Sequence, residues 1–85
     1  MKHAGAAALD TLEPVLAQLR VLDGLKEKSR GTFYRKSKAF LHFHEDPAGF
    51  FADIKLGDDF VRLPVNNRAE IAALIREAKR ALAGR

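Results

Sequence analysis

Apolar and polar side chains alternate from Phe33 to Leu56, and this is the clearest pattern along the chain. Such alternation is typical of antiparallel strands that bury one face. Turn residues divide the stretch and its continuation, so we expect strands near Gly31–Arg35, Lys38–His44, Gly49–Leu56 and Phe60–Val65. Pro64 cannot donate a hydrogen bond to a neighbouring strand, so the fourth strand should be short or lie at an edge. A sheet of three strands is the alternative.

Helical spacing replaces the alternation on both sides of this region. After Thr11 the apolar side chains recur every three or four residues, at Val15, Leu16, Leu19 and Leu22, and Asp23-Gly24 is typical of a helix end. A second apolar stripe consists of Ile71, Leu74, Ile75, Ala78 and Leu82. Asn67 as cap with Glu70 three residues later predicts its start. The sequence therefore predicts an α+β fold: an N-terminal helix, a four-stranded antiparallel sheet and a C-terminal helix, with both helices on one face.

Size and composition limit the kind of protein. Its 85 residues, 47% hydrophobic and 31% charged, suit a single domain over residues 1–85, in which residues 1–10 form a frayed or weakly helical start. The chain has no cysteine, which fits a reducing compartment, and we expect a cytoplasmic protein. No apolar run approaches the ~20 residues that a membrane span needs, so we expect no membrane partner.

One face of the predicted sheet carries a mixture of aromatic and polar side chains. If the alternation is strict, five residues of the second and third strands share the side away from the helices: Phe40, His42, His44, Phe51 and Asp53. Exposed apolar patches usually mark interfaces. We therefore expect a binding protein that self-associates or binds another protein through this open sheet face.

Two other functions stay open. A basic segment could contact nucleic-acid phosphates independently of sequence, or could be an ordinary solvated loop and turn; it consists of Lys26, Lys28, Arg30, Arg35, Lys36 and Lys38. His42 and His44 point to the same side of one strand, and Asp53 on the next strand could complete a metal site with an associated activity. The alternative is that all three are ordinary polar positions. The sequence indicates no catalytic residue and no cofactor, and it favours binding over catalysis.

Several short motifs are similar to a known family. They are Leu22-Asp23-Gly24-Leu25-Lys26-Glu27, Gly31-x-Phe33, Lys38-Ala39-Phe40-Leu41, His44-Glu45-Asp46 and Asp53-Ile54-Lys55-Leu56. In this order, between Leu12 and Leu82, the chain resembles the YjbR-like (MmcQ-like) family of small bacterial proteins. It departs from the family at Asp23, where Pro is usual, at Ser37, where Gly is usual, and in lacking an aromatic-rich insertion before the last strand. The resemblance implies an α+β fold related to the double-wing arrangement and, by fold analogy, DNA binding. It carries over no catalytic residue.

Overall fold

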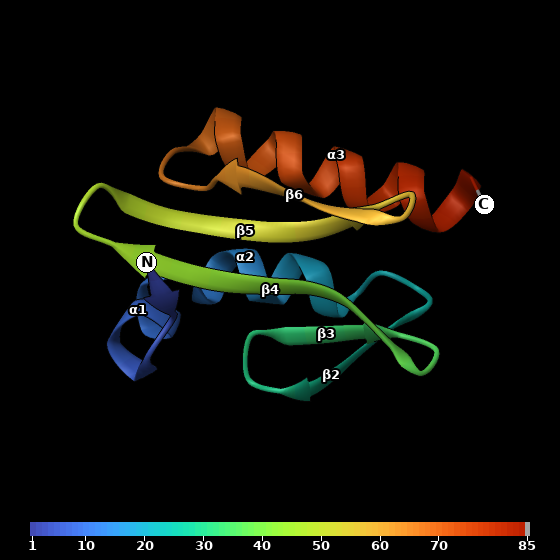
Figure 1. The fold of residues 1–85 in the computed structure, drawn as a ribbon, viewed down its shortest axis with the longest axis horizontal. Coiled ribbons are helices and arrows are strands. Elements are labelled where there is room, and N and C mark those ends of the chain that lie inside the picture. The colour runs from blue at the N-terminus through green and yellow to red at the C-terminus, as the bar shows by residue number, and fades with distance from the viewer. Residues whose placement is uncertain (85) are drawn as a thin grey trace.

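The computed structural model of the protein describes residues 1–84, and in this part of the chain an antiparallel sheet of six strands is covered by three helices on one face (Figure 1). The elements follow one another as β1 (Lys2–His3), α1 (Ala6–Thr11), α2 (Glu13–Arg20), β2 (Leu25–Ser29), β3 (Thr32–Arg35), β4 (Lys38–Asp46), β5 (Gly49–Leu56), β6 (Asp59–Pro64) and α3 (Arg68–Gly84). The sheet order is β2-β3-β4-β5-β6, and β1 pairs with the far end of β4. The α+β fold with both helical regions on one face is thus confirmed.

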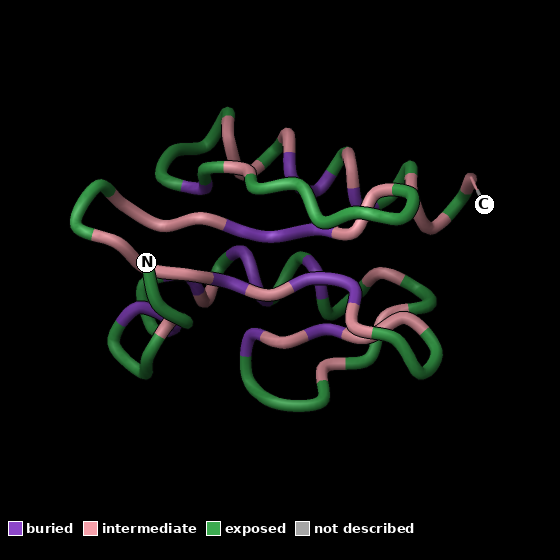
Figure 2. The backbone as a smooth tube through the Cα atoms, viewed as in Figure 1, coloured by how far each residue is buried: buried purple, intermediate pink, exposed green. Residues whose placement is uncertain are grey.

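The hydrophobic core lies between the helices and the middle strands. Leu16 and Leu19 of α2 and Leu74 of α3 are fully buried, and they belong to the same cluster as Leu41 of β4 and Ile54 of β5. The buried positions of Figure 2 accordingly fall in the middle of these strands and on the helix sides that face them. The opposite face of β4, β5 and β6 carries no helix, which leaves that face free to form a site.

The start of α3 and the end of β6 lie where the sequence predicts them. The Glu70 amide donates a 2.9 Å hydrogen bond to Asn67 Oδ1, so the predicted cap at Asn67 is confirmed, whereas the Glu70 side chain accepts a 2.8 Å hydrogen bond from the amide of Asn66 instead of that of Asn67. The Asn66 side chain also bonds both backbone groups of Phe50, which fixes α3 to β5. Pro64 is the last residue of the edge strand β6, as expected.

The N-terminal half differs from the prediction in two places. Residues 26–31, expected as a charged connection between the first helix and the sheet, include most of the edge strand β2, in which Lys26 and Lys28 are exposed. Charged side chains are common on edge strands because they discourage pairing with other chains. Residues 1–10, expected as a frayed or weakly helical start, contain β1 and most of the short helix α1, and the buried Ala8 and Leu9 attach α1 to the rest of the molecule.

The placement of Phe40 on the open face was wrong. Phe33 pairs with Leu41, but the next pair is Tyr34 with Ala39, so Phe40 is an extra residue on β4. This β-bulge interrupts the alternation of side chains. Phe40 is therefore 3% exposed and belongs to the core, although strict alternation assigned it to the side of His42.

No helix of residues 1–84 has the length and apolar character that crossing a membrane would require.

Candidate metal centre

All three histidines of the chain meet on the open face of the sheet. His42 and His44 lie two residues apart on β4, as the alternation predicts, and β1 pairs His3 directly with His44. The Gly5 amide donates a 2.6 Å hydrogen bond to Glu45, which holds the chain after β1 against β4. Residues 39 positions apart in sequence thus share one site.

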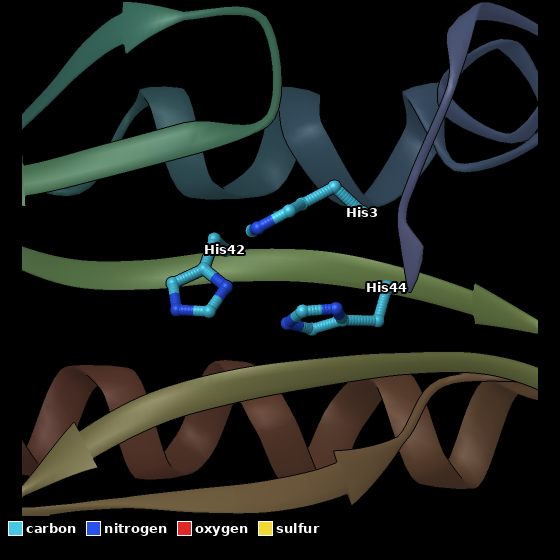
Figure 3. A group of neighbouring side chains, drawn as sticks. All are labelled: His3, His42 and His44. Atoms are coloured by element: carbon cyan, nitrogen blue, oxygen red, sulfur yellow. The ribbon is translucent and has the colours of Figure 1, made fainter. Parts of the chain in front are cut away.

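The three imidazole rings lie close together (Figure 3): the ring of His3 stacks on that of His44, and His42 meets His44 edge-on. The ring centroids of His3 and His44 are 4.7 Å apart, those of His42 and His44 are 5.0 Å apart, and those of His3 and His42 are 5.6 Å apart. One ring nitrogen of each lies within 4.8 Å of the others. Three points so spaced are at most about 2.8 Å from a common centre, and zinc needs nitrogen at about 2.0–2.1 Å. Binding would therefore require the three nitrogens to move closer together.

Several nitrogens of this cluster have no partner within the described chain. Nδ1 of His42 and both ring nitrogens of His44 are buried without a hydrogen bond to residues 1–84. Nε2 of His44 does lie 3.1 Å from Oδ2 of Asp53, but without the alignment that a hydrogen bond requires. Leaving a buried polar atom unpaired costs free energy, so such atoms usually have a function or a missing partner. A metal ion would satisfy one nitrogen of each ring, because a neutral imidazole has one lone pair and its other nitrogen carries a proton.

Asp53 lies beside the cluster, next to His44 and Arg62. Arg62 on β6 donates to both of its carboxylate oxygens, at 2.8 and 2.9 Å. This pair holds the pKa of Asp53 below its usual value. The sequence grouped Asp53 with His42 and His44, and the structure adds His3 to the two histidines. A carboxylate beside a ligating imidazole is a common way to orient the ring, and Asp53 has this position relative to His44.

The environment favours the form of His42 that binds metals. Burial lowers the pKa of His42 below its usual value, and the neighbouring His44, His3 and Arg62 act in the same direction. The charge of Asp53 opposes this shift without reversing it. His42 is therefore a neutral imidazole near pH 7, and the neutral ring is the one with a lone pair for a metal.

Aromatic side chains border the histidines on the same face. Phe51 is half-buried and pairs with His44 across β4 and β5. The ring centroid of Phe60 is 5.3 Å from that of His42, and 42% of Phe60 is exposed. The sequence predicted Phe51 here but did not identify Phe60 or His3. Phe60 could have been placed on this face only if the register of β6 had been known. The one sequence signal for His3 was that the chain has a third histidine.

The residues of the predicted basic segment are spread over three neighbouring strands and two turns. Arg30, in the turn before β3, forms ion pairs with Asp10 and Glu13, at 2.7 and 2.9 Å. Lys36 and Lys38 lie beyond the opposite end of β3. Lys26 and Lys28 belong to β2, where the Lys28 ammonium lies over the ring of Tyr34. The six candidates thus lie on β2, β3, β4 and the turns that join them, and Arg35 pairs with Lys38 across β3 and β4.

Comparisons of the chain with protein-family models, with curated proteins and with solved structures give no match in any of the three. The resemblance to the YjbR-like family stays a prediction. The chemistry of the site is therefore inferred from its geometry.

Proposed function

We propose that the protein binds a divalent transition-metal ion, with zinc as the first candidate, through His3, His42 and His44. The observation that carries the proposal is the convergence of three imidazoles, with one ring nitrogen of each within 4.8 Å of the others. Unpaired buried nitrogens in His42 and His44 add a physical reason for an ion to bind there.

The donor set narrows the choice of ion. Imidazole nitrogen suits zinc, copper and nickel, whereas magnesium and calcium prefer oxygen. Three histidines leave the fourth position of a tetrahedral zinc ion for water or another ligand. His3 is exposed, so this fourth position has access to solvent. The proposed role is metal binding with an open coordination position, and the site contains no separate group assigned to catalysis.

Cobalt(II) provides a direct test because tetrahedral and octahedral cobalt complexes differ strongly in visible absorption. The protein should develop the intense bands of tetrahedral cobalt at one equivalent, and zinc should remove them. Replacing any one ligand, as His3→Ala, His42→Ala or His44→Ala, should abolish the bands, and the neighbouring Lys2→Ala should preserve them as a matched control. A weak octahedral spectrum in the unmodified protein would contradict the proposal.

Self-association through the open sheet face is a second proposal. It is supported by Phe60, a large apolar side chain 42% exposed beside His42. Sedimentation velocity over a wide concentration range, with zinc and with a chelator, tests it. We expect a concentration-dependent shift that Phe60→Ser reduces, and a strict monomer under both conditions would exclude it.

A further inference from the structure

A cavity of about 690 Å³ opens at one end of the sheet, away from the turn that joins β4 to β5. Its walls are the β3–β4 turn, the β5–β6 turn and the second half of α3. In Figure 1 these three segments surround the right-hand end of the molecule. The volume falls in the range of sites that bind small molecules, about 300–1,000 Å³.

The cavity follows from the bulge at Phe40. The pairing of β4 with β5 ends at Leu41 and Ile54, whereas β4 continues beside β3 and β5 continues beside β6. The two central strands therefore separate toward this end, and Phe40 lies where they part. The Arg35 guanidinium donates a 3.1 Å hydrogen bond to the Ala81 carbonyl and so connects β3 to α3 across the opening.

The cavity is strongly basic. Two of the residues that line it, Asp58 and Glu77, are acidic. Five are basic: Arg35, Lys36, Lys38, Lys55 and Arg80. Glu77 is paired with Arg80 at 3.2 Å. The three lysines form no ion pair with any acidic side chain of residues 1–84. Lys36, at the tip of its hairpin, has a φ of 60°, which most residues avoid. Concentrated positive charge in a concave site attracts anions.

We propose that this cavity binds a phosphorylated small molecule of nucleotide size. Lysine ammonium and arginine guanidinium groups are the usual partners of phosphate oxygens. Ala39 and Leu56 give the same cavity an apolar wall, which suits the organic part of such a ligand better than a bare anion. Its size and concave shape favour a small molecule over a nucleic-acid strand, whose backbone would need a basic surface extending along the molecule.

Isothermal titration calorimetry with ATP and with pyrophosphate tests the proposal. A chelator is present throughout, so the result does not depend on the metal centre. The double variant Lys36→Gln/Lys38→Gln removes two charges from the cavity. The matched control Lys26→Gln/Lys28→Gln removes two charges from β2, outside the cavity. Circular dichroism verifies that both variants fold.

We expect one saturable ATP site, at least about tenfold weaker in the cavity variant and changed by less than about twofold in the control. Absence of saturable binding to ATP and pyrophosphate at low salt would overturn the proposal. Equal weakening in both variants would also overturn it, because binding would then follow net charge. Tighter binding of a single-stranded oligonucleotide than of ATP, weakened by both variants, would assign the positive charge to nucleic acid instead.

Discussion

Replacing His3 by alanine is the sharpest test of the metal centre because it removes a proposed ligand without disturbing the core. His3 is exposed and lies on a two-residue strand, whereas His42 and His44 are partly buried among other groups. Exposed substitutions usually change stability by less than about 0.5 kcal/mol. Without metal, His3→Ala should therefore melt close to the unmodified protein.

The effect of zinc on stability can be estimated from binding linkage. At a free zinc concentration one hundred times the dissociation constant, an ion that binds only the folded state adds about 2.7 kcal/mol. For a domain of this size, each kcal/mol raises the melting temperature by about 4–8 °C, so the rise is about 11–22 °C. If loss of one ligand weakens binding a hundredfold, the same zinc concentration stabilises His3→Ala by only about 0.4 kcal/mol, or about 2–3 °C.

Differential scanning fluorimetry with increasing zinc, followed by excess chelator, measures these shifts. Lys2→Ala is the matched control, because Lys2 lies next to His3 on β1 and its side chain is outside the cluster. It should show the full zinc-dependent rise, and the chelator should reverse that rise in both proteins.

Two results would refute the reasoning. If zinc leaves the melting temperature of the unmodified protein unchanged, the cluster does not bind the ion. If zinc raises the melting temperature of His3→Ala by as much as that of the unmodified protein, His3 is not a ligand and the set drawn from the geometry is wrong.

Three other predictions concern the stability of the fold. Phe40→Ala should lower the free energy of unfolding in urea by about 3–5 kcal/mol because Phe40 is in the core. A decrease of less than about 0.5 kcal/mol would indicate that Phe40 lies on the open face instead. Arg62→Leu should lower the midpoint of unfolding in the same assay, because it leaves the carboxylate of Asp53 without its two hydrogen bonds from Arg62; an unchanged midpoint would show that the pair contributes nothing. The hydrogen bond from Arg20 holds the pKa of Glu27 below 4.5, so its stabilisation is complete above that pH and is lost as the pH falls through the lower folded value. Glu27→Gln should reduce the acid-induced fall in melting temperature, and unchanged pH profiles would contradict this.

The parts of the fold that could be predicted depend on local periodicity. The alternation in β5 and the apolar stripe of α3 each depend on residues close in sequence, and both are confirmed. The cap at Asn67 likewise depends on two residues that are only three positions apart. Edge strand β2 was missed because its side chains are mostly charged, and what makes it a strand is pairing with β3, which begins only three residues later.

The candidate site was half predictable for a related reason. His42 and His44 are two residues apart on a strand, and this spacing alone puts both imidazoles on one side. His3 reaches them through two backbone pairings formed across about 40 residues of chain. A strand of two residues has no periodicity to detect. The error at Phe40 has the same origin. A bulge is a property of two paired strands, so it cannot be detected in the sequence of one strand alone.

The brevity of β1 also connects the metal centre with the stability of the N-terminal segment. β1 pairs only with β4, through Lys2 and His3, and both residues are exposed. Few buried contacts and exposed hydrogen bonds are typical of segments that open locally at low free-energy cost. When β1 opens, the proposed centre keeps two of its three imidazoles. The apparent affinity for the ion is therefore the affinity of the closed form multiplied by the fraction of molecules in which β1 is closed. Conversely, an ion held by His3 favours the closed strand. The frayed start expected from the sequence and the paired strand of the structure can therefore be two states of one segment, and zinc would shift their balance toward the second.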